Sequence, residues 1–319
     1  MQPEPTGALP ALRPRCVLCY TMRVNAQYGW DAEVAIMPAK IKIGSQEHLE
    51  LFCRSFIDTH DPYDIEKIEW PELDRDTHGR LAALPFWNEA VSTEGNVALK
   101  VQALVPLISD PLLREAIALQ GFEEGRHSAL LGKMTSHYGI EVPPFVRDPL
   151  SDAEWDFIRT GYGECFDSFF AFGLFSLAGE SGFFPPALLR LFEPIIQEEA
   201  RHILFFVNWI AYRRVRHPLF QRPHDLWQTT LALALQVWAR IQTARGAQTD
   251  DFLLQSTESV KLDITFRGFL ERCLQENDRR LRLYDQRLLR PRLVPGIAGA
   301  ILKVSGGRRG AATPVATQQ

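Results

Sequence analysis

The chain has 319 residues, of which 46% are hydrophobic and 23% are charged, so it can bury a large core and is not a disordered protein. Its 35 Lys and Arg residues against 39 Asp and Glu residues give a formal net charge of −4, which provides no overall basic field for nucleic acid. Five cysteines do not make a disulfide framework. Cys16 and Cys19 form one CxxC motif without a second pair at zinc-ribbon spacing, so we expect reduced thiols in a cytoplasmic protein.

Residues 1–80 are expected to form an N-terminal extension. Residues 1–15 lack the apolar run of a signal peptide, and no stretch of the sequence reaches the 18 apolar residues that suggest a membrane span. Residues 34–44 are the one segment with the pattern of an extended chain. A helix is predicted at about 45–58, followed by an irregular, Pro- and Asp-rich connection over 61–76.

Four long helices are predicted next. The second begins at Asp110-Pro111, where an acidic N-cap precedes a proline. Ser151 is expected to cap the third helix together with Glu154. Pro194 either kinks the fourth helix or marks its true start. The four helices span about 86–105, 109–138, 151–181 and 185–216, within a bundle domain of residues 81–217.

The remaining chain is predicted to contain two more helices, at about 225–244 and 255–288. They belong to a C-terminal region, residues 218–304, which we expect to pack on the bundle. Residues 305–319 are small, polar and Gly-rich, and are expected to form a flexible tail. The predicted fold class is therefore all-α: a four-helix bundle with additional N- and C-terminal helices.

The motif Glu-Glu-x-Arg-His occurs twice, at residues 123–127 and 198–202. Pro111 precedes His127 at the same spacing at which Pro186 precedes His202. Glu89 and Glu164 align under the same 75-residue shift, each 35 residues before the second Glu of its motif. The shared frame and flanks indicate an internal duplication of a helix pair.

Each motif places a carboxylate and an imidazole three residues apart, so Glu124 with His127, and Glu199 with His202, share one helix face. An inward-facing pair of this kind is costly to bury unless a cation compensates it. Two such pairs and two further carboxylates make four acids and two histidines, a set that suits iron or manganese better than zinc. This pattern predicts a dinuclear site with two Fe ions, or a Mn/Fe pair, inside a four-helix bundle.

The residues that supply the two further carboxylates stay open at this stage. Antiparallel helices need their ligands at the same height above the connecting turn. In the first helix, height does not separate Glu89 from Glu94, and the repeat symmetry favours Glu89. In the third helix we prefer Glu164, with Asp167 next, while Glu180 fits only if the fourth helix begins at Pro194.

The motifs within residues 86–216 resemble those of the ferritin-like di-iron carboxylate superfamily, and their spacings are similar to those of its p-aminobenzoate N-oxygenase and acyl carrier protein desaturase branches. The resemblance implies that the Glu-x-x-His residues are metal ligands and that the metals activate O2 or peroxide. The N-oxygenase branch carries a further histidine one turn before the Glu of the fourth helix, where this chain has Ile195. The expected metal-binding and catalytic residues are Glu89, Glu124, His127, Glu164, Glu199 and His202.

Neighbouring residues in the motifs have two interpretations. Glu123 and Glu198 either hydrogen-bond the histidine of the opposite motif or face solvent. Arg126 and Arg201 are expected to pair with nearby carboxylates. The six other histidines, His60 among them, have no acid three residues before them, and we expect surface or capping roles for them.

The expected function is that of an oxidoreductase, a dinuclear iron or manganese/iron enzyme that activates O2 and oxidises a small, largely apolar organic substrate. The alternative is iron storage or detoxification by a ferritin-like protein without an organic substrate, and a metal-free helical scaffold is a third hypothesis. The long segments before and after the bundle favour an enzyme, because a storage subunit resembles a bare bundle.

No Rossmann fingerprint occurs, so electrons come from a separate donor protein or from the substrate. We expect neither nucleic acid nor a membrane span as a partner, and a homodimer is left open.

Overall fold

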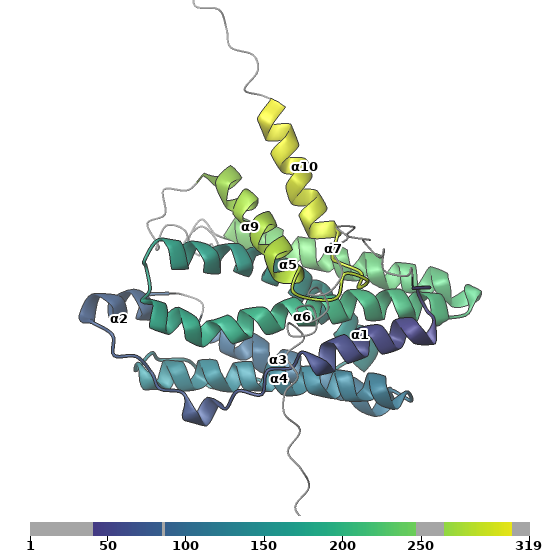
Figure 1. Ribbon diagram of the computed structural model, residues 1–319, viewed down its shortest axis with the longest axis horizontal. Coiled ribbons are helices and arrows are strands. Elements are labelled where there is room, and N and C mark those ends of the chain that lie inside the picture. Colours follow the sequence, from purple (N-terminus) through teal and green to yellow (C-terminus); the bar gives the residue numbers. More distant parts are fainter. Residues whose placement is uncertain (1–40, 85–86, 247–264, 308–319) are drawn as a thin grey trace, which may run out of the picture. The chain divides into compact units, whose positions relative to one another are not determined.

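The computed structural model describes residues 41–84, 87–246 and 265–307, all of which belong to one unit, Lys40–Gln319. Within these ranges the chain is helical and contains no strand, which confirms the predicted all-α class (Figure 1). Residues 41–44, at the end of the segment expected to be extended, form no strand either. The rest of that segment, and the CxxC motif at Cys16 and Cys19, lie outside the described residues.

Nine α-helices and three short 3-10 helices make up the described part of the chain. The α-helices are α1 (Gln46–Asp58), α2 (Arg75–Ala82), α3 (Trp87–Leu104), α4 (Pro111–His137), α5 (Ala153–Glu180), α6 (Pro186–Arg216), α7 (Arg222–Gly246), α9 (Phe266–Leu281) and α10 (Leu293–Gly307). The 3-10 helices are η2 (Ile65–Lys67), η3 (Val105–Leu107) and η4 (Leu219–Gln221).

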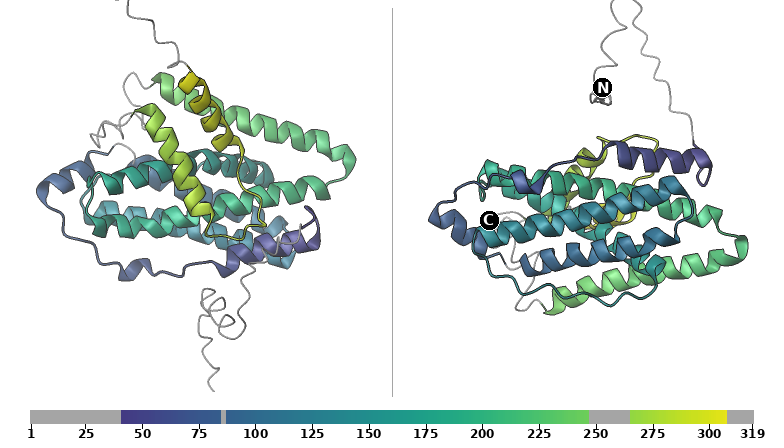
Figure 2. Two further views of the ribbon diagram at one scale, coloured as in Figure 1. Left: turned by 45° about the horizontal axis from the view of Figure 1, so that its top comes forward. Right: turned by 90° about the horizontal axis from the view of Figure 1, so that it is seen from below.

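The four long helices α3 to α6 pack against one another. α3 lies along α4 and α5 along α6, and the two pairs meet through α3 with α5 and through α4 with α6 (Figures 1 and 2). Each consecutive pair is joined by a short connection, so its two helices run in opposite directions. All four helices can therefore present side chains to one shared interior.

The helix starts follow local capping chemistry. The Asp110 carboxylate accepts a hydrogen bond from the Leu113 N–H at 3.0 Å, and Pro111 occupies the first turn, as predicted. The expected cap of α5 at Ser151 is wrong: Asp152 is the N-cap and accepts from the Trp155 N–H at 2.8 Å. α6 begins at Pro186 and continues through Pro194, so the later start is also wrong.

The other helices cover the bundle. α1 packs on α4 and α6, α7 and α9 pack on α5, and α10 packs on α9 and α5. Two helices were not expected: α2 lies partly inside the connection predicted to be irregular, and α10 follows a helix that ends at Leu281 rather than near 288. No helix in the described ranges has the length and apolar character needed to cross a membrane.

Close packing between α5 and α6 depends on Gly161. A side chain at this position would overlap the ring of Phe206 on α6. Phe206 is fully buried and packs edge-on against Phe157, one turn before Gly161. The glycine therefore lets α5 approach α6, which carries the second motif.

Candidate metal centre

The two histidines of the repeated motif meet in the interior between α4 and α6. His127 and His202 have no exposed surface, and their ring centroids are 5.6 Å apart. Glu124, one turn before His127, is also buried. The spacing that places each Glu and His on one helix face therefore directs both pairs toward the same point.

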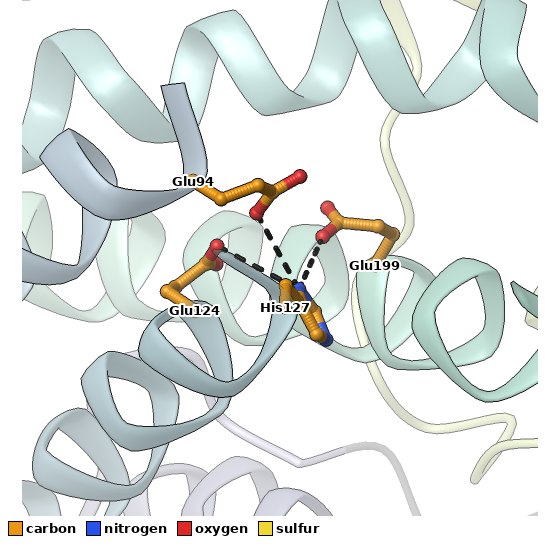
Figure 3. A group of neighbouring side chains, drawn as sticks. All are labelled: Glu94, Glu124, His127 and Glu199. Carbon is orange, nitrogen blue, oxygen red and sulfur yellow. Dashed lines mark ion pairs between the residues drawn. The ribbon is translucent and has the colours of Figure 1, made fainter. Parts of the chain in front are cut away.

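A first group of potential ligands surrounds His127. Figure 3 shows carboxylates from α3, α4 and α6 pointing toward its ring. The Nδ1 atom of His127 lies 3.3 Å from Glu199 Oε1, 3.5 Å from Glu94 Oε2 and 3.9 Å from Glu124 Oε2. One ligand atom from each of the four residues lies within 4.8 Å of the others, a spread that a single cation can fill.

A second group lies next to the first and shares a residue with it. Glu124, Glu164 and His202 bring their ligand atoms within 4.8 Å of one another. His202 Nδ1 is 2.7 Å from Glu124 Oε1 and 3.7 Å from Glu199 Oε1. Glu124 therefore belongs to both groups, and Glu199 lies near both histidines.

Four buried atoms in this cluster have no hydrogen-bond partner: Nδ1 of His127, Nδ1 of His202, and one carboxylate oxygen of Glu124 and of Glu164. Two of them, His202 Nδ1 and Glu124 Oε1, lie 2.7 Å apart without a hydrogen bond between them. A buried polar atom without a partner is costly, and several together usually mark a bound ion or water. These atoms are the donor types that bind iron and manganese, so the residues fit such a metal.

The first glutamate of each motif reaches across to the histidine of the other. Glu198 Oε2 is 2.8 Å from His127 Nε2, and Glu123 Oε2 is 2.9 Å from His202 Nε2. The predicted arginine pairing is also present, because Arg126 donates to Glu198 and Arg201 to Glu123. This confirms the first of the two interpretations of these acids.

The cross-contacts determine which ring nitrogen is available to a metal. A carboxylate that already accepts from an arginine has no proton to give, so each histidine donates its Nε2–H to the opposite glutamate. When a metal displaces the second proton of the ring, the lone pair is on Nδ1, the atom that faces the other carboxylates. Contacts of this type orient the ring and make it a better metal ligand.

The connection between α1 and α2, residues 59–74, contacts both of these outer glutamates. His60 hydrogen-bonds Glu123, and the Tyr63 hydroxyl lies 3.5 Å from Glu198. The Arg126 guanidinium donates to the backbone oxygen of Asp61 at 3.0 Å and stacks over the Tyr63 ring at 3.7 Å. The expected surface or capping role for His60 is therefore wrong. Its contact is long-range, and no spacing in the sequence signals it.

Of the two candidates on α3, the structure brings Glu94 and not Glu89 into the cluster. Glu89 is exposed in the first turn of the helix. Five residues rotate a helix by about 140°, so the two side chains point in different directions. The structure thus does not bring Glu89, the preferred residue, to the cluster. The repeat symmetry misplaces it because the inward face of α3 carries Glu94, which lies one turn before the buried Val97 and two turns before the buried Val101.

On α5 the structure brings Glu164 into the cluster and leaves both alternatives outside. The Asp167 side chain is 70% exposed and pairs with Arg240 of α7. Glu180 is exposed at the end of α5 and pairs with Arg272 of α9 at 2.6 Å. Of the six residues expected from the sequence, those now together are Glu124, His127, Glu164, Glu199 and His202.

Two further polar side chains contact the cluster and were not anticipated. Gln120 is buried one turn before Glu124, and its amide nitrogen is 3.5 Å from Glu164 Oε2 while its oxygen has no partner. The Ser168 hydroxyl donates to Glu199 Oε2 at 3.2 Å. Gln120 lies at i−4 from Glu124, a spacing that could have indicated it.

Burial of so many acids changes their protonation. Burial and the neighbouring Glu199 carboxylate raise the pKa of Glu164 to about 8, and burial raises the pKa of Glu124 well above its usual value. Burial alone would lower the pKa of His127 and His202, but the surrounding carboxylates outweigh it and raise both. Without a cation, the cluster therefore holds protons near neutral pH, and a metal would displace them.

The outer glutamate behaves in the opposite way. Burial would raise the pKa of Glu123, but His202 and Arg201 outweigh it and hold the pKa well below the usual value. Glu123 therefore stays a carboxylate, as its contact with the His202 Nε2–H requires.

The described residues thus contain buried Glu and His groups that can hold a metal ion. Comparisons of the chain with protein-family models, with curated proteins and with solved structures find no match.

Proposed function

We propose that the protein is a ferritin-like oxidoreductase that uses a carboxylate-bridged pair of iron ions, or a manganese/iron pair, to oxidise a small organic substrate with O2. The observation that carries the proposal is that the two potential ligand groups share Glu124. Each group also contains a histidine, His127 or His202, whose Nδ1 atom has no hydrogen-bond partner. One isolated metal would not need a second histidine 5.6 Å away with the same surroundings. The antiparallel bundle of α3 to α6 supports the same interpretation.

In this proposal Glu94 and His127 hold one ion, and Glu164 and His202 hold the other. Glu124 and Glu199 lie between the two. When bound, the metal pair supplies the redox chemistry that activates O2.

The chain's other residues keep the ligands ready. Glu123 and Glu198 hold the proton on Nε2 of the two histidines, so that both Nδ1 lone pairs stay directed inward. Arg126 and Arg201 balance the charge of these two glutamates in the interior. The buried Phe56 of α1 packs against the His202 ring, with the ring centroids 5.8 Å apart, and limits the water that reaches the cluster.

Access to the cluster is inferred from the members that are not fully buried. The Glu94 side chain is 22% exposed and that of Glu199 is 12% exposed, whereas both histidines are completely covered. Glu164 of α5 is also only partly buried. We therefore infer that O2 and substrate approach from the side of α3 and α5, where the Glu94 and Glu164 carboxylates lie.

The test is metal analysis of protein from iron-supplemented cells, followed by an absorption spectrum when the reduced protein meets O2. We expect about two iron or manganese ions per chain and a new visible band after oxygen exposure. One zinc ion per chain, with no spectral change, would reject the redox proposal. A large cage on gel filtration that takes up many iron ions would favour storage instead.

A further inference from the structure

Helix α10 is apolar on two sides. Val294 and Ala298 are buried against Phe269 of α9 and Phe166 of α5. A second row of apolar residues lies about 100° around the helix from Val294 and Ala298, because its first two members each precede one of these residues by one position. Its members are spaced by four, four and three residues, so they share one side of the helix. This outer row is 41–72% exposed and consists of Leu293, Ile297, Ile301 and Val304.

An exposed apolar row of this length is unusual for a surface helix. Helices on globular proteins normally turn a polar face outward, and a helix that is apolar all round is buried in a core or in lipid. α10 meets α9 and α5 on its inner side (Figures 1 and 2). Lys303 is the one charged residue in the helix.

The charge around α10 differs from that of the rest of the chain. Asp285 is the last acidic residue of the given sequence, and the 34 residues after it contain six cations and no anion, although the whole chain carries a net charge of −4. Arg292 and Lys303, at the two ends of the outer row, are both exposed. Two further arginines, Arg308 and Arg309, follow in the sequence beyond the described residues.

We infer that α10 docks on the surface of an anionic phospholipid bilayer. The outer row would enter the boundary between headgroups and acyl chains, with Arg292 and Lys303 at the lipid phosphates. Interfacial helices combine an apolar side with basic residues in this way, and each cation near an anionic leaflet adds to the attraction. A second copy of the chain is a poorer occupant, because it would bring two sets of cations together with no acid in either segment to pair with them.

Vesicle flotation of the full chain tests this inference. We compare vesicles of phosphatidylcholine with vesicles that also contain phosphatidylglycerol. Binding to the anionic vesicles should be at least about tenfold tighter, and it should weaken as salt rises from about 0.1 M to about 0.5 M. Ile297→Glu with Val304→Glu should lower binding by at least about tenfold. Arg292→Glu with Lys303→Glu should remove the preference for anionic vesicles.

The matched control is on α7, where Trp227 and Trp238 are 62% and 56% exposed. Trp227→Glu with Trp238→Glu should leave vesicle binding unchanged, and equal losses from this pair would mean nonspecific adhesion. Circular dichroism and metal content show whether each variant is folded. Absence of binding by the unsubstituted chain, or equal binding to neutral and anionic vesicles, overturns the inference. A dimer that the Ile297→Glu and Val304→Glu pair dissociates, without vesicle binding, would assign the row to a second copy.

Discussion

The two halves of the candidate centre use the same inner residues but different outer ones. In both halves a Glu-x-x-His pair faces inward, and the preceding glutamate crosses to the other half. Glu123 then contacts an imidazole, that of His60, whereas Glu198 contacts the phenol of Tyr63. A repeat in the sequence can therefore produce a nearly symmetric ligand set, while a segment outside the repeat makes the two positions unequal.

A second asymmetry lies inside the bundle. Gln120 contacts Glu164, and the residue 75 positions later is Ile195, which offers no polar contact. The half that contains Glu164 therefore has the Gln120 amide beside this carboxylate, whereas the equivalent position of the other half is the apolar Ile195. If two ions bind as proposed, their affinities are expected to differ, although each of the two ligand groups contains one histidine.

The largest expected effect comes from the residue common to both halves. Glu124→Ala removes a carboxylate that belongs to both ligand groups, so we expect the protein to lose both ions. Metal analysis after dialysis measures this. Glu124→Gln, which keeps the size of the side chain, separates loss of ligation from loss of packing. Full metal content in both variants would contradict the shared role.

A smaller loss of metal is expected when a carboxylate that belongs to only one ligand group is removed. Glu94→Ala and Glu164→Ala should each leave about one ion bound, because each residue belongs to only one group. Glu89→Ala is the control on the same helix, and it should retain both ions because Glu89 is exposed outside the cluster. Metal loss from Glu89→Ala equal to that from Glu94→Ala would reject the assignment on α3.

Removing the contacts that His60 and Tyr63 make to Glu123 and Glu198 should weaken metal binding less, and by different amounts. His60→Ala removes a close contact to Glu123, so we expect about tenfold weaker binding of one ion. Tyr63→Phe should have less effect, because its hydroxyl is 3.5 Å from Glu198, at the outer limit of a hydrogen bond. Metal titration by calorimetry compares the two variants, with His60→Gln as the conservative replacement.

His78→Ala is the matched control for His60. His78 lies on α2, and its imidazole hydrogen-bonds the Tyr138 backbone oxygen at 2.7 Å rather than a glutamate of the cluster. Its loss should change the melting temperature but not metal affinity. If His78→Ala and His60→Ala weaken metal binding equally, the His60 contact does not act on the ligands.

The mildest perturbation is a change in pH. The pKa of Glu164 is raised to about 8, so below that pH a metal must displace its proton. Affinity should therefore rise with pH by about tenfold per unit for each proton displaced, up to at least pH 8, because His127 and His202 also hold raised pKa values. Calorimetry in buffers of different ionisation enthalpy measures the protons released. Affinity that is constant between pH 6 and 8 would contradict the protonated state of the metal-free cluster.

Periodicity predicted the parts of the site that depend on one helix at a time. Glu124 with His127, and Glu199 with His202, are on shared faces because their spacing is three, and this holds whatever the partner helices do. That Arg126 pairs with a carboxylate was also predicted, but its partner, Glu198, lies on α6, 72 residues away in sequence. The choice between Glu89 and Glu94 depends on which face of α3 packs against α4 and α5, and the sequence does not state this.

The parts that could not be predicted depend on long-range contacts or on weak local patterns. His60 is 63 residues away from Glu123 in sequence, and nothing in its neighbourhood marks the contact. Pro295, Gly296 and Gly299 give α10 a poor helical pattern, so the sequence suggested no helix there. α2 was hidden by the Pro- and Asp-rich residues around it, although Asp74 caps it well.

The most direct measurement is X-ray absorption spectroscopy at the iron edge of the metal-loaded protein. A metal pair predicts nitrogen and oxygen neighbours and a second metal at about 3.5–4 Å, as in two-metal sites. The second-metal signal should vanish in Glu94→Ala while the remaining ion keeps its imidazole. An iron environment that contains sulfur, or one without a second metal at full loading, would contradict the account.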